Sequence, residues 1–376
     1  MHQFAFFICL LPLLSLVACN NTETITDPGN PSDLSRVLAG SNNEKFKKAV
    51  KPREFKFPQD HGPHADYKTE WWYVTGNLET DKQRKFGFQF TLFRRGISPD
   101  QPESMSAWAT NQIYMAHFAI SDIENESFYS DERFSRASLK LAGAQAQPFK
   151  VWLLDWVLQS EKDMFFPLIL KVHQDNMGVT LKLKPLKPRV LHGDNGLSKK
   201  GSKEGNASYY YSYTRLETTG ELTLNNKKFS VKGLSWLDRE WSTSALDKSQ
   251  IGWDWFSLQL SSGDDIMFYQ LRNKKGKIDK SSAGSYIDKN GRLTGLTYQQ
   301  ISIKPRSFWK SPTGVEYPSS WTLNIPEKNI KLQIKPLMNN QELNHSVRYW
   351  EGAVRITGKV NSNPVTGQGY VELSGY

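Results

Sequence analysis

The sequence Ser235-Trp-Leu-Asp-Arg-Glu-Trp241, followed shortly by Gly252-Trp-Asp-Trp-Phe-Ser-Leu-Gln-Leu260, places four tryptophans and three carboxylates in one short stretch. Both segments have the composition and alternation of β-strands. Side chains alternate between the two faces of a strand. One face of the first segment then holds Trp236, Asp238 and Glu240, and the other holds Leu237, Arg239 and Trp241.

Acidic groups among bulky aromatic side chains call for a physical explanation. Burial of a carboxylate is costly unless the group is paired, and burial shifts its pKa toward the neutral acid. A carboxylic acid on an aromatic wall can bind or protonate an apolar molecule. The alternative is a structural ion-pair network formed by Arg239 and the neighbouring carboxylates.

The N-terminus resembles that of a bacterial lipoprotein. Phe4 to Val17 is an apolar run that is too short to span a bilayer but is typical of a signal sequence. It ends in Leu16-Val17-Ala18-Cys19, which resembles a lipobox, although the preceding region carries only His2 and no lysine or arginine. Asn20 follows the cysteine, which favours the outer membrane. We therefore expect a lipid-modified Cys19 and a location in the bacterial cell envelope, on the periplasmic face of the outer membrane.

The cysteine content and the net charge narrow the possible classes of function. The sequence has no cysteine after Cys19, which excludes a disulfide, a cysteine nucleophile and a cysteine-ligated zinc site in the mature chain. The formal net charge is +10. Outside the cytoplasm this charge favours contact with anionic lipid headgroups over nucleic acid, and a solvated basic surface without a partner is the alternative.

Short strand-like runs dominate the sequence after a polar, turn-rich tether at residues 20–50. Residues 71–76 and 86–93 predict a hairpin, with Phe86, Phe88, Phe90 and Leu92 on one face. Similar runs continue to the C-terminus, and helical periodicity is missing. We expect an all-β protein with two tandem antiparallel β-domains at residues 51–228 and 229–376, after a signal peptide at residues 1–19.

Three histidines are further candidates for a site. His61-Gly-Pro-His64 lies on a predicted loop, just before Glu70-Trp71-Trp72. A metal site there lacks the usual ligand spacing, whereas a histidine bonded to a carboxylate can act as an acid, a base or an anchor. His117 lies in a predicted strand, where a hydrogen-bonded core histidine is the alternative. Sequence motifs of serine hydrolases, nucleotide enzymes and zincins are absent.

Several motifs together resemble the AttH-like, carotenoid 1,2-hydratase-related lipocalin-like family. The resemblance runs from about residue 55 to the C-terminus. The motifs are His61-Gly-Pro-His64, Tyr67-Lys-Thr-Glu-Trp-Trp-Tyr73, Gly76-Asn-Leu78, Ala116-His117-Phe118, Tyr209-Tyr-Tyr-Ser-Tyr213, Trp236-Leu-Asp-Arg-Glu-Trp241, Gly252-Trp-Asp-Trp-Phe256, Tyr349-Trp-Glu-Gly352 and Gly369-Tyr-Val-Glu-Leu-Ser-Gly-Tyr376. The resemblance implies two lipocalin-like β-barrels, apolar ligands of isoprenoid or polyketide type and, in some relatives, an ABC transporter.

In the hydratase branch, the resemblance implies chemistry without a cofactor or a metal. An acid protonates an alkene, aromatic faces stabilise the cation, and water adds. Asp238 or Glu240 would be the acid. The aromatic cage would be formed by Trp236, Trp241, Trp253 and Trp255.

These observations leave three functions open. The first is a membrane-anchored protein that binds a lipid or isoprenoid-like molecule, with an ABC export system as partner. The second is a cofactor-free hydratase, isomerase or cyclase. The third is a hydrolase in which a histidine and a carboxylate activate water.

The candidate catalytic residues are Asp238, Glu240 and His64. The candidate ligand-binding residues are His61, Glu70, Trp71, Trp72, His117, Trp236, Arg239, Trp241, Trp253, Asp254 and Trp255. We expect the clusters near residues 70 and 240 to face the seam between the two β-domains.

Overall fold

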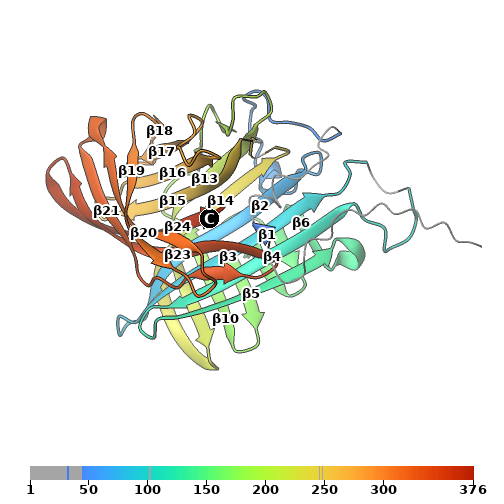
Figure 1. Cartoon of the computed structure of the whole chain (residues 1–376). Helices are drawn as coiled ribbons and strands as arrows, with labels where there is room; N and C mark the ends of the chain where they lie inside the picture. The colour runs from blue at the N-terminus through green and yellow to red at the C-terminus, as the bar shows by residue number, and fades with distance from the viewer. Residues whose placement is uncertain (1–31, 34–44, 101–102, 245, 248) are drawn as a thin grey trace, which may run out of the picture.

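The computed structural model describes residues 32–33, 45–100, 103–244, 246–247 and 249–376. Two large antiparallel sheets account for almost all of the regular structure, as the sequence predicted. Figure 1 shows them packed against each other, with the second sheet in orange and red beside the blue, cyan and green strands of the first. The helical elements of the described residues are short 3₁₀ turns, η1 (Gln59–His61), η2 (Ser138–Lys140) and η3 (Pro326–Lys328). No helix in these ranges is long and apolar enough to cross a membrane.

The first sheet has the strand order β5-β4-β3-β2-β14-β13-β10-β9-β8-β7-β6, with β11 and β12 paired to β13. Strand β7 also contacts β3, β4 and β5, so the sheet curls into a nearly closed barrel. The strands are β2 (Thr69–Glu79), β3 (Lys85–Gly96), β4 (Gln112–Asp122), β5 (Ser127–Arg136), β6 (Ala142–Ala146), β7 (Phe149–Leu153), β8 (Trp156–Ser160), β9 (Leu168–Gln174), β10 (Met177–Pro185), β11 (Val190–Leu191), β12 (Leu197–Lys199), β13 (Ala207–Leu224) and β14 (Lys227–Ser242).

The second sheet has the strand order β18-β17-β16-β15-β24-β23-β21-β20-β19, with β1 and β22 paired to β23. The strands are β1 (Ser32–Asp33), β15 (Gln250–Leu260), β16 (Asp265–Asn273), β17 (Ala283–Ile287), β18 (Leu293–Thr297), β19 (Ser302–Lys310), β20 (Glu316–Ile325), β21 (Ile330–Pro336), β22 (Glu342–Asn344), β23 (Val347–Val360) and β24 (Asn363–Ser374).

Strand alternation gives each sheet its own apolar core. The predicted face of Phe86, Phe88, Phe90 and Leu92 is fully buried inside the first sheet. Phe256, Trp321 and other apolar residues fill the second. Each core removes a large apolar area from water, which is the dominant favourable term in folding.

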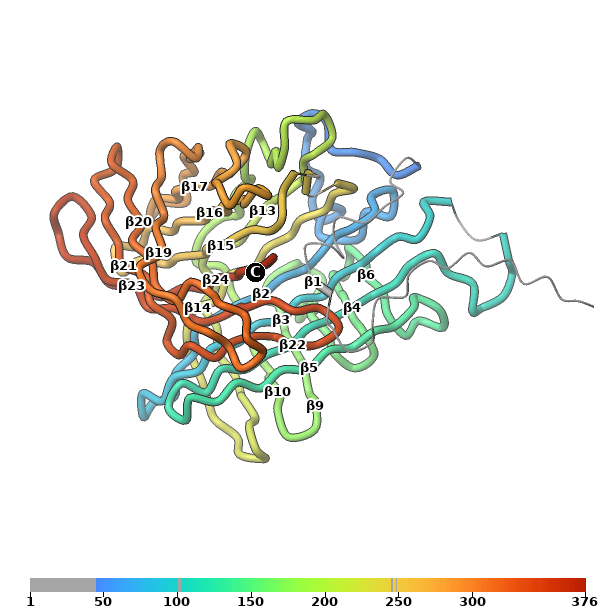
Figure 2. Tube along the Cα trace, viewed as in Figure 1, coloured from blue at the N-terminus to red at the C-terminus, as the bar shows by residue number. Residues whose placement is uncertain are grey.

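A third cluster joins the two sheets. It packs Tyr73, Tyr210 and Trp236 of the first sheet against Trp255 and Tyr269 of the second. Strands β2 and β3 lie against β24 and β23 at this junction, as the Cα trace in Figure 2 shows. We call this junction the seam.

Two expected boundaries need correction. The first sheet continues through β14 to Ser242 and the second begins with β15, so the change between sheets lies after residue 242 and not at 228/229. Part of the expected tether also belongs to the fold. Strand β1 pairs with β23, and Phe46 and Ala49 are buried. The expected signal peptide with Cys19 lies outside the described residues.

Glu70 and two arginines form a charged network inside the first barrel. Glu70 is fully buried and accepts hydrogen bonds from Arg94, from Arg239 Nη2 at 3.0 Å and from the His64 backbone N–H at 2.9 Å. Burial would raise the pKa of Glu70, but the charges of Arg94 and Arg239 outweigh it and hold the pKa well below its usual range. This is the structural ion-pair network that we considered as an alternative, but its carboxylate comes from β2.

We expect Glu70→Gln to destabilise the protein by about 3–5 kcal/mol at pH 7, because it leaves two buried guanidinium groups without their counter-charge. Since the folded-state pKa of Glu70 is depressed, its stabilisation is present above the unfolded-state pKa and declines as the pH falls. Urea unfolding at pH 7 and pH 4 should therefore show a smaller loss at the lower pH. Asp100→Asn, which breaks the exposed Lys45–Asp100 pair, is the control and should change little. Equal losses in the two variants would contradict this assignment.

Candidate functional site

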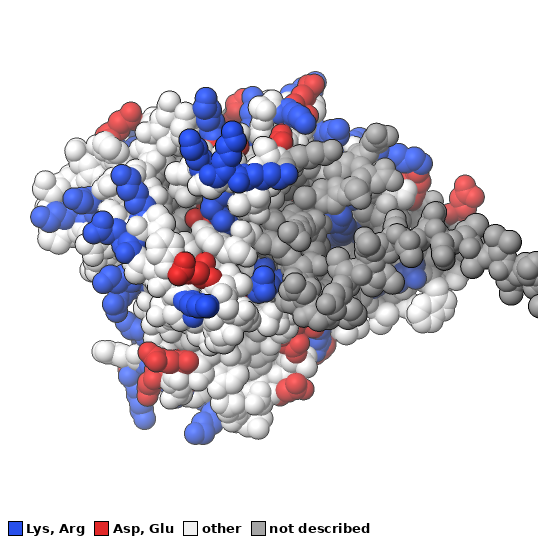
Figure 3. Space-filling view, viewed as in Figure 1, with Lys and Arg blue, Asp and Glu red and all other residues white. Residues whose placement is uncertain are grey.

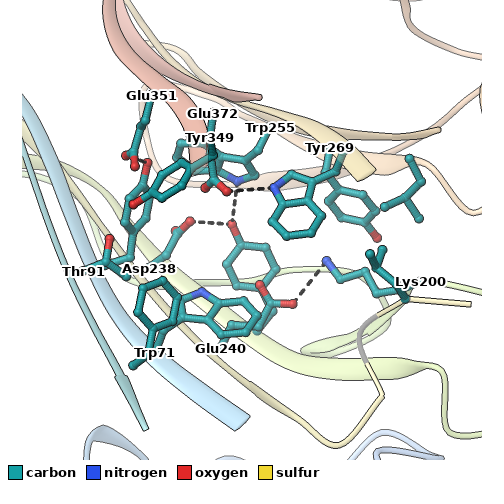
Figure 4. A pocket seen from close by; sticks show the side chains of 16 residues that line it. Trp71, Thr91, Lys200, Asp238, Glu240, Trp255, Tyr269, Tyr349, Glu351 and Glu372 are labelled. Carbon is teal, nitrogen blue, oxygen red and sulfur yellow. Dashed lines mark hydrogen bonds and ion pairs between the residues drawn. The ribbon is translucent and has the colours of Figure 1, made fainter. Parts of the chain in front are cut away.

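A pocket lies in the seam and is lined by both sheets (Figure 4). Its empty space is about 730 Å³, including the part that opens to solvent. The residues that line it are Trp71, Tyr73, Thr91, Phe93, Lys200, Tyr210, Asp238, Glu240, Leu246, Trp253, Trp255, Tyr269, Leu271, Tyr349, Glu351 and Glu372.

The register of the paired strands explains which residues line the pocket. Across the first sheet, Phe93, Trp71, Glu240 and Tyr210 form one row of directly opposed residues, and Thr91, Tyr73, Asp238 and Ser212 form the next. Across the second sheet, Tyr269, Trp255, Glu372 and Glu351 form a corresponding row. Directly opposed side chains on one face of a sheet are close neighbours. Each row therefore places carboxyl groups beside aromatic rings.

Asp238 lies on β14 and is 2% exposed. Its Oδ2 accepts a hydrogen bond from the Tyr210 hydroxyl at 2.6 Å. Its Oδ1 accepts one from Trp236 Nε1 at 2.6 Å and one from the Ser212 hydroxyl. The Tyr210 hydroxyl also accepts a bond from Trp255 Nε1 at 3.2 Å, so the hydrogen bonds cross the seam.

Burial raises the pKa of Asp238 to about 7. The hydrogen bonds from Ser212, Tyr210 and Trp236 act in the opposite direction, and the nearby Glu240 charge adds to the rise. A carboxyl group with such a pKa carries its proton in a large fraction of molecules near neutral pH. Asp238 can therefore give up a proton there, which is what a general acid requires.

A second layer of polar groups supports Asp238 from behind. His192 is fully buried, and its Nε2 lies 2.7 Å from the Ser212 hydroxyl while its Nδ1 lies 2.9 Å from the Ser285 hydroxyl. Burial lowers the pKa of His192 to about 3, so the ring is neutral. A neutral imidazole can accept from Ser212, which then can accept from a protonated Asp238. This chain lets Asp238 change its protonation state without leaving a buried partner unsatisfied.

Glu240 has a different partner. Its Oε1 lies 3.2 Å from Lys200 Nζ and accepts a hydrogen bond from Ser208. The Lys200 ammonium also lies 3.5 Å from the centre of the Tyr269 ring, which is a cation–π contact. Glu240 is therefore neutralised by a cation, whereas Asp238 is not.

Two more carboxyl groups face the pocket from the second sheet. Glu351 and Glu372 are directly opposed on β23 and β24. Glu351 accepts a hydrogen bond from the Tyr73 hydroxyl, and Glu372 accepts one from Trp253 Nε1 at 3.0 Å. Burial, and then the Glu372 charge, raise the pKa of Glu351 well above its usual value.

The AttH-like family profile matches residues 48–376, which includes both sheets and the seam. The chain belongs to the AttH-like family. The crystal structure of a protein described as an AttH from Nitrosomonas europaea is 36% identical, with a TM-score of 0.78, and the match covers 88% of this chain and 100% of that one.

Kievitone hydratase from Nectria haematococca has a similar fold. Its crystal structure is 18% identical with a TM-score of 0.68, and the match covers 88% of this chain and 96% of that one. The fold prediction of two tandem lipocalin-like antiparallel β-barrel domains is thus confirmed for this AttH-like chain.

Two curated relatives are similar in sequence. Kievitone hydratase of Fusarium solani subsp. phaseoli is 22% identical over 173 residues, which is 44% of this chain and 49% of the relative. Dehydratase asqC of Emericella nidulans is 22% identical over 221 residues, which is 54% of this chain and 60% of the relative. The chain thus spans about half to three-fifths of the length of the curated relatives that it matches.

The structure brings part of the expected site together. The expected site residues that line the seam pocket are Trp71, Asp238, Glu240, Trp253 and Trp255. Trp236 packs in the seam cluster and donates to Asp238.

Six expected site residues lie away from the pocket, around the Glu70 network of the first barrel. They are His61, His64, Glu70, Trp72, Arg239 and Trp241. Arg239 lies over the Trp72 ring. His64 bonds Asp60 and Glu70 and stacks on the Trp241 ring at 3.8 Å between centres. His61 bonds the Tyr211 hydroxyl at 2.7 Å. Alternation turns these residues away from the seam, so the expectation that Glu70 faces it was wrong.

The last two expected residues have structural partners. Asp254 is on the face of β15 opposite Trp253 and Trp255, where Tyr376 and Arg272 bind it. His117 is fully buried and bridges the sheets, with its Nδ1 2.7 Å from the Tyr349 hydroxyl and its Nε2 2.9 Å from Glu132.

Sequence reasoning did not single out several pocket residues. Tyr73, Tyr210, Tyr349, Glu351 and Glu372 lie within motifs that carry the family resemblance, which was the available signal. No sequence motif marked Lys200 or His192 as a site residue, because the residues that they contact lie far away in the sequence.

The raised pKa of Asp238 predicts a specific effect on stability. A carboxyl group whose folded-state pKa lies above its unfolded-state value makes stability fall as the pH rises between the two values. In the wild type, this contribution should cost stability between about pH 4 and pH 7. Asp238→Asn should remove it, so that the variant is relatively more stable at pH 8 than at pH 5. Urea unfolding at both pH values measures this, and an unchanged difference between variant and wild type would contradict the pKa assignment.

Proposed function

We propose that this protein adds water to, or removes water from, an apolar small molecule bound in the seam pocket, using its own side chains. The observation that carries this proposal is Asp238, a buried acid with a pKa of about 7 on the wall of an aromatic pocket. The names of the two curated relatives, a hydratase and a dehydratase, support the same reaction class.

In the hydration direction, Asp238 gives its proton to one carbon of a carbon–carbon double bond. The π electron pair becomes the new C–H bond, and the neighbouring carbon becomes a cation. Trp71, Trp253 and Trp255 line the pocket, and their rings stabilise a cation because an aromatic face carries partial negative charge. The ionised Asp238 then also stabilises the cation electrostatically.

Water completes the addition by forming a C–O bond to the cation and losing a proton. The proton returns to Asp238 through Tyr210, whose hydroxyl bonds the carboxylate directly, and this restores the starting state. Dehydration is the same sequence in reverse, since the acid and base roles exchange. The neutral ring of His192 behind Ser212 keeps Asp238 hydrogen-bonded in both states.

We expect Asp238→Asn to lower kcat at least about 100-fold, because a general acid contributes about 10² to 10⁴ in rate. Turnover is measured by mass spectrometry, as gain or loss of water in H₂¹⁸O, with kievitone and a panel of isoprenoid-like alkenes and tertiary alcohols. In the hydration direction, wild-type kcat should fall as the pH rises through about 7, because Asp238 loses its proton there.

Asp254→Asn is the matched control, since Asp254 lies in the same tryptophan-rich stretch but faces away from the pocket. Its kcat should stay within about threefold of the wild type for folded protein. Equal activity in the Asp238 variant and the wild type would overturn the proposed acid. If the protein binds a probe tightly but neither the wild type nor any variant turns it over, the result would favour a ligand carrier, which the sequence also suggested.

We also propose that the mature chain is anchored to the bacterial outer membrane through lipid on Cys19, which rests on the Leu16-Val17-Ala18-Cys19 motif alone. In a bacterial host, the wild type should incorporate radiolabelled palmitate and sediment with membranes. Cys19→Ser should lose both the label and the sedimentation, because the acylated thiol is gone. Label retained in the variant would contradict this proposal.

A further inference from the structure

Lys200 is a lysine on the wall of the seam pocket. Figure 3 shows lysine and arginine side chains spread over the visible face of the molecule, with acidic side chains between them. Lys200, in contrast, is 8% exposed and lines the pocket together with aromatic and carboxyl side chains. Lysine is seldom buried to this extent unless its ammonium group has partners. The proposed hydration at Asp238 does not use this ammonium group.

The fold fixes the position of Lys200 from several sides. Its backbone N–H donates to the Asn206 carbonyl at 2.8 Å, and its own carbonyl accepts from Gln250 Nε2 at 2.7 Å. Its Nζ lies 3.5 Å from the centre of the Tyr269 ring, and the Tyr269 hydroxyl donates to the Lys199 carbonyl at 3.0 Å. The ammonium group is therefore positioned before a ligand arrives, which lowers the entropy cost of binding.

The contacts of Lys200 leave donor capacity for a ligand. An ammonium group has three N–H donors. Among the described residues, Glu240 is the one carboxylate within ion-pair distance of Lys200 Nζ, at 3.2 Å. Tyr269 contacts the ammonium group through the face of its ring, which offers no oxygen. The remaining donors are available to an oxygen of a molecule in the pocket.

Lys187 shows how this protein satisfies a buried ammonium group away from the seam. The side chain of Lys187 is 4% exposed. Its Nζ lies 2.8 Å from Asp265 Oδ2 and 2.9 Å from the Asp288 carbonyl oxygen. Two oxygens of the protein thus accept from Lys187, which does not line the seam pocket. Lys200 has one such oxygen and borders a space that a ligand can enter, so the difference favours a binding role for Lys200.

Glu240 determines what kind of oxygen suits Lys200. The Glu240 carboxylate balances the charge of the ammonium group, so Lys200 offers hydrogen-bond donors more than net positive charge. A ligand carboxylate would bring a further negative charge close to Glu240 in a place of low dielectric. A carbonyl or hydroxyl oxygen of a neutral molecule brings no such charge and can still accept from Lys200.

Strand geometry sets the separation between Lys200 and the proposed acid. Asp238 and Glu240 both line the pocket and are two residues apart on β14, which separates their Cα atoms by about 7 Å. In the view of Figure 4, the Glu240 carboxyl group lies between Asp238 and Lys200. An oxygen held by Lys200 would therefore lie about 7 Å or more from a carbon that Asp238 protonates. This separation also keeps the ammonium group away from the carbon that becomes cationic.

We propose that Lys200 anchors a carbonyl or hydroxyl oxygen of a neutral apolar substrate and thereby places the double bond of that substrate at Asp238. The inference rests on the proposed function for the reacting end of the molecule. The substrate class is then an apolar skeleton with an oxygen acceptor about 7 Å or more from its double bond. Binding of the oxygen does not require a reaction, so the anchor can be tested by itself.

A matched pair of probes tests the anchor without turnover. Geranylacetone is a neutral ketone with an isoprenoid skeleton, and the second probe is the same skeleton with a methylene group in place of the carbonyl. Dissociation constants are measured by quenching of tryptophan fluorescence in the wild type and in Lys200→Met. We expect the variant to bind the ketone at least about tenfold more weakly, because hydrogen bonds from a charged donor are strong. Its affinity for the hydrocarbon should change by about threefold or less.

The double variant Lys200→Met, Glu240→Gln removes both members of the ion pair, so that no carboxylate is left without its cation. It should show the same selective loss, and it serves if the single variant does not fold. Lys328→Met is the matched control. Lys328 Nζ also lies over an aromatic ring, 4.2 Å from the centre of Tyr286, but Lys328 does not line the pocket. Its variant should keep the wild-type affinity for both probes.

Kinetics give a second measurement for a ketone that the wild type hydrates. Lys200→Met should raise KM about tenfold and lower kcat by a smaller factor, because the anchor acts in both the ground state and the transition state. Asp238→Asn should instead lower kcat, since the acid acts in the transition state. The two variants therefore separate substrate anchoring from proton transfer.

Equal weakening of ketone and hydrocarbon binding in Lys200→Met would overturn the anchor. A ketone affinity that both Lys200 variants leave unchanged would do the same, as would a wild type that does not bind the ketone. If the ketone-selective loss occurs but no probe is turned over, the anchor stands and the hydration chemistry fails. If Asp238-dependent turnover occurs and Lys200→Met changes neither the Kd nor the KM of the ketone, the chemistry stands and the anchor fails.

Discussion

The two-residue alternation of β2 and β14 is the constraint on which the rest of the structure depends. These neighbouring strands pair Asp238 with Tyr73, Arg239 with Trp72, Glu240 with Trp71 and Trp241 with Glu70. Every second pair faces the barrel interior, and the pairs between them face the seam. A slip of one residue would exchange the two sets and put the Glu70 network into the pocket. The buried faces on both sides of these strands hold the register in place.

The same residue types have different roles on the two faces because their partners differ. Inside the barrel, Glu70 lies between two guanidinium groups, so its charge is neutralised and its pKa is depressed. In the seam, Asp238 has neutral donors only, so burial dominates and its pKa rises. A carboxylate that is always ionised can fix a structure, whereas one that titrates near neutral pH can exchange a proton with a bound molecule. The chain therefore contains, on adjacent strands, one buried carboxyl group held by cations and one held by neutral donors.

Much of the seam could be predicted from local sequence. Alternation alone assigned Trp236, Asp238 and Glu240 to one face, because strand geometry has a fixed period of two residues. The same rule, applied to residues 69–79, would have separated Trp71 from Glu70 and Trp72, which we placed together because they are adjacent in the sequence. Residues such as His192, Lys200 and Glu351 could not be connected to Asp238 in this way. Strand pairing and sheet packing bring them together from distant parts of the chain, and the local pattern carries no information about those pairings.

The sequence by itself determined that the chain is all-β and that the side chains of its strands alternate between two different faces. It also determined that carboxyl groups would be buried among tryptophans. These are local properties, set by side-chain period, turn residues and composition. Only the tertiary structure decided which carboxyl groups have a cation as partner and which do not. That distinction depends on Arg94 and Arg239 converging on Glu70, on Lys200 pairing with Glu240, and on neutral donors surrounding Asp238 in the seam. The pKa of a carboxyl group, and with it the chemistry of the tryptophan-rich stretch at 235–260, is a property of that three-dimensional environment.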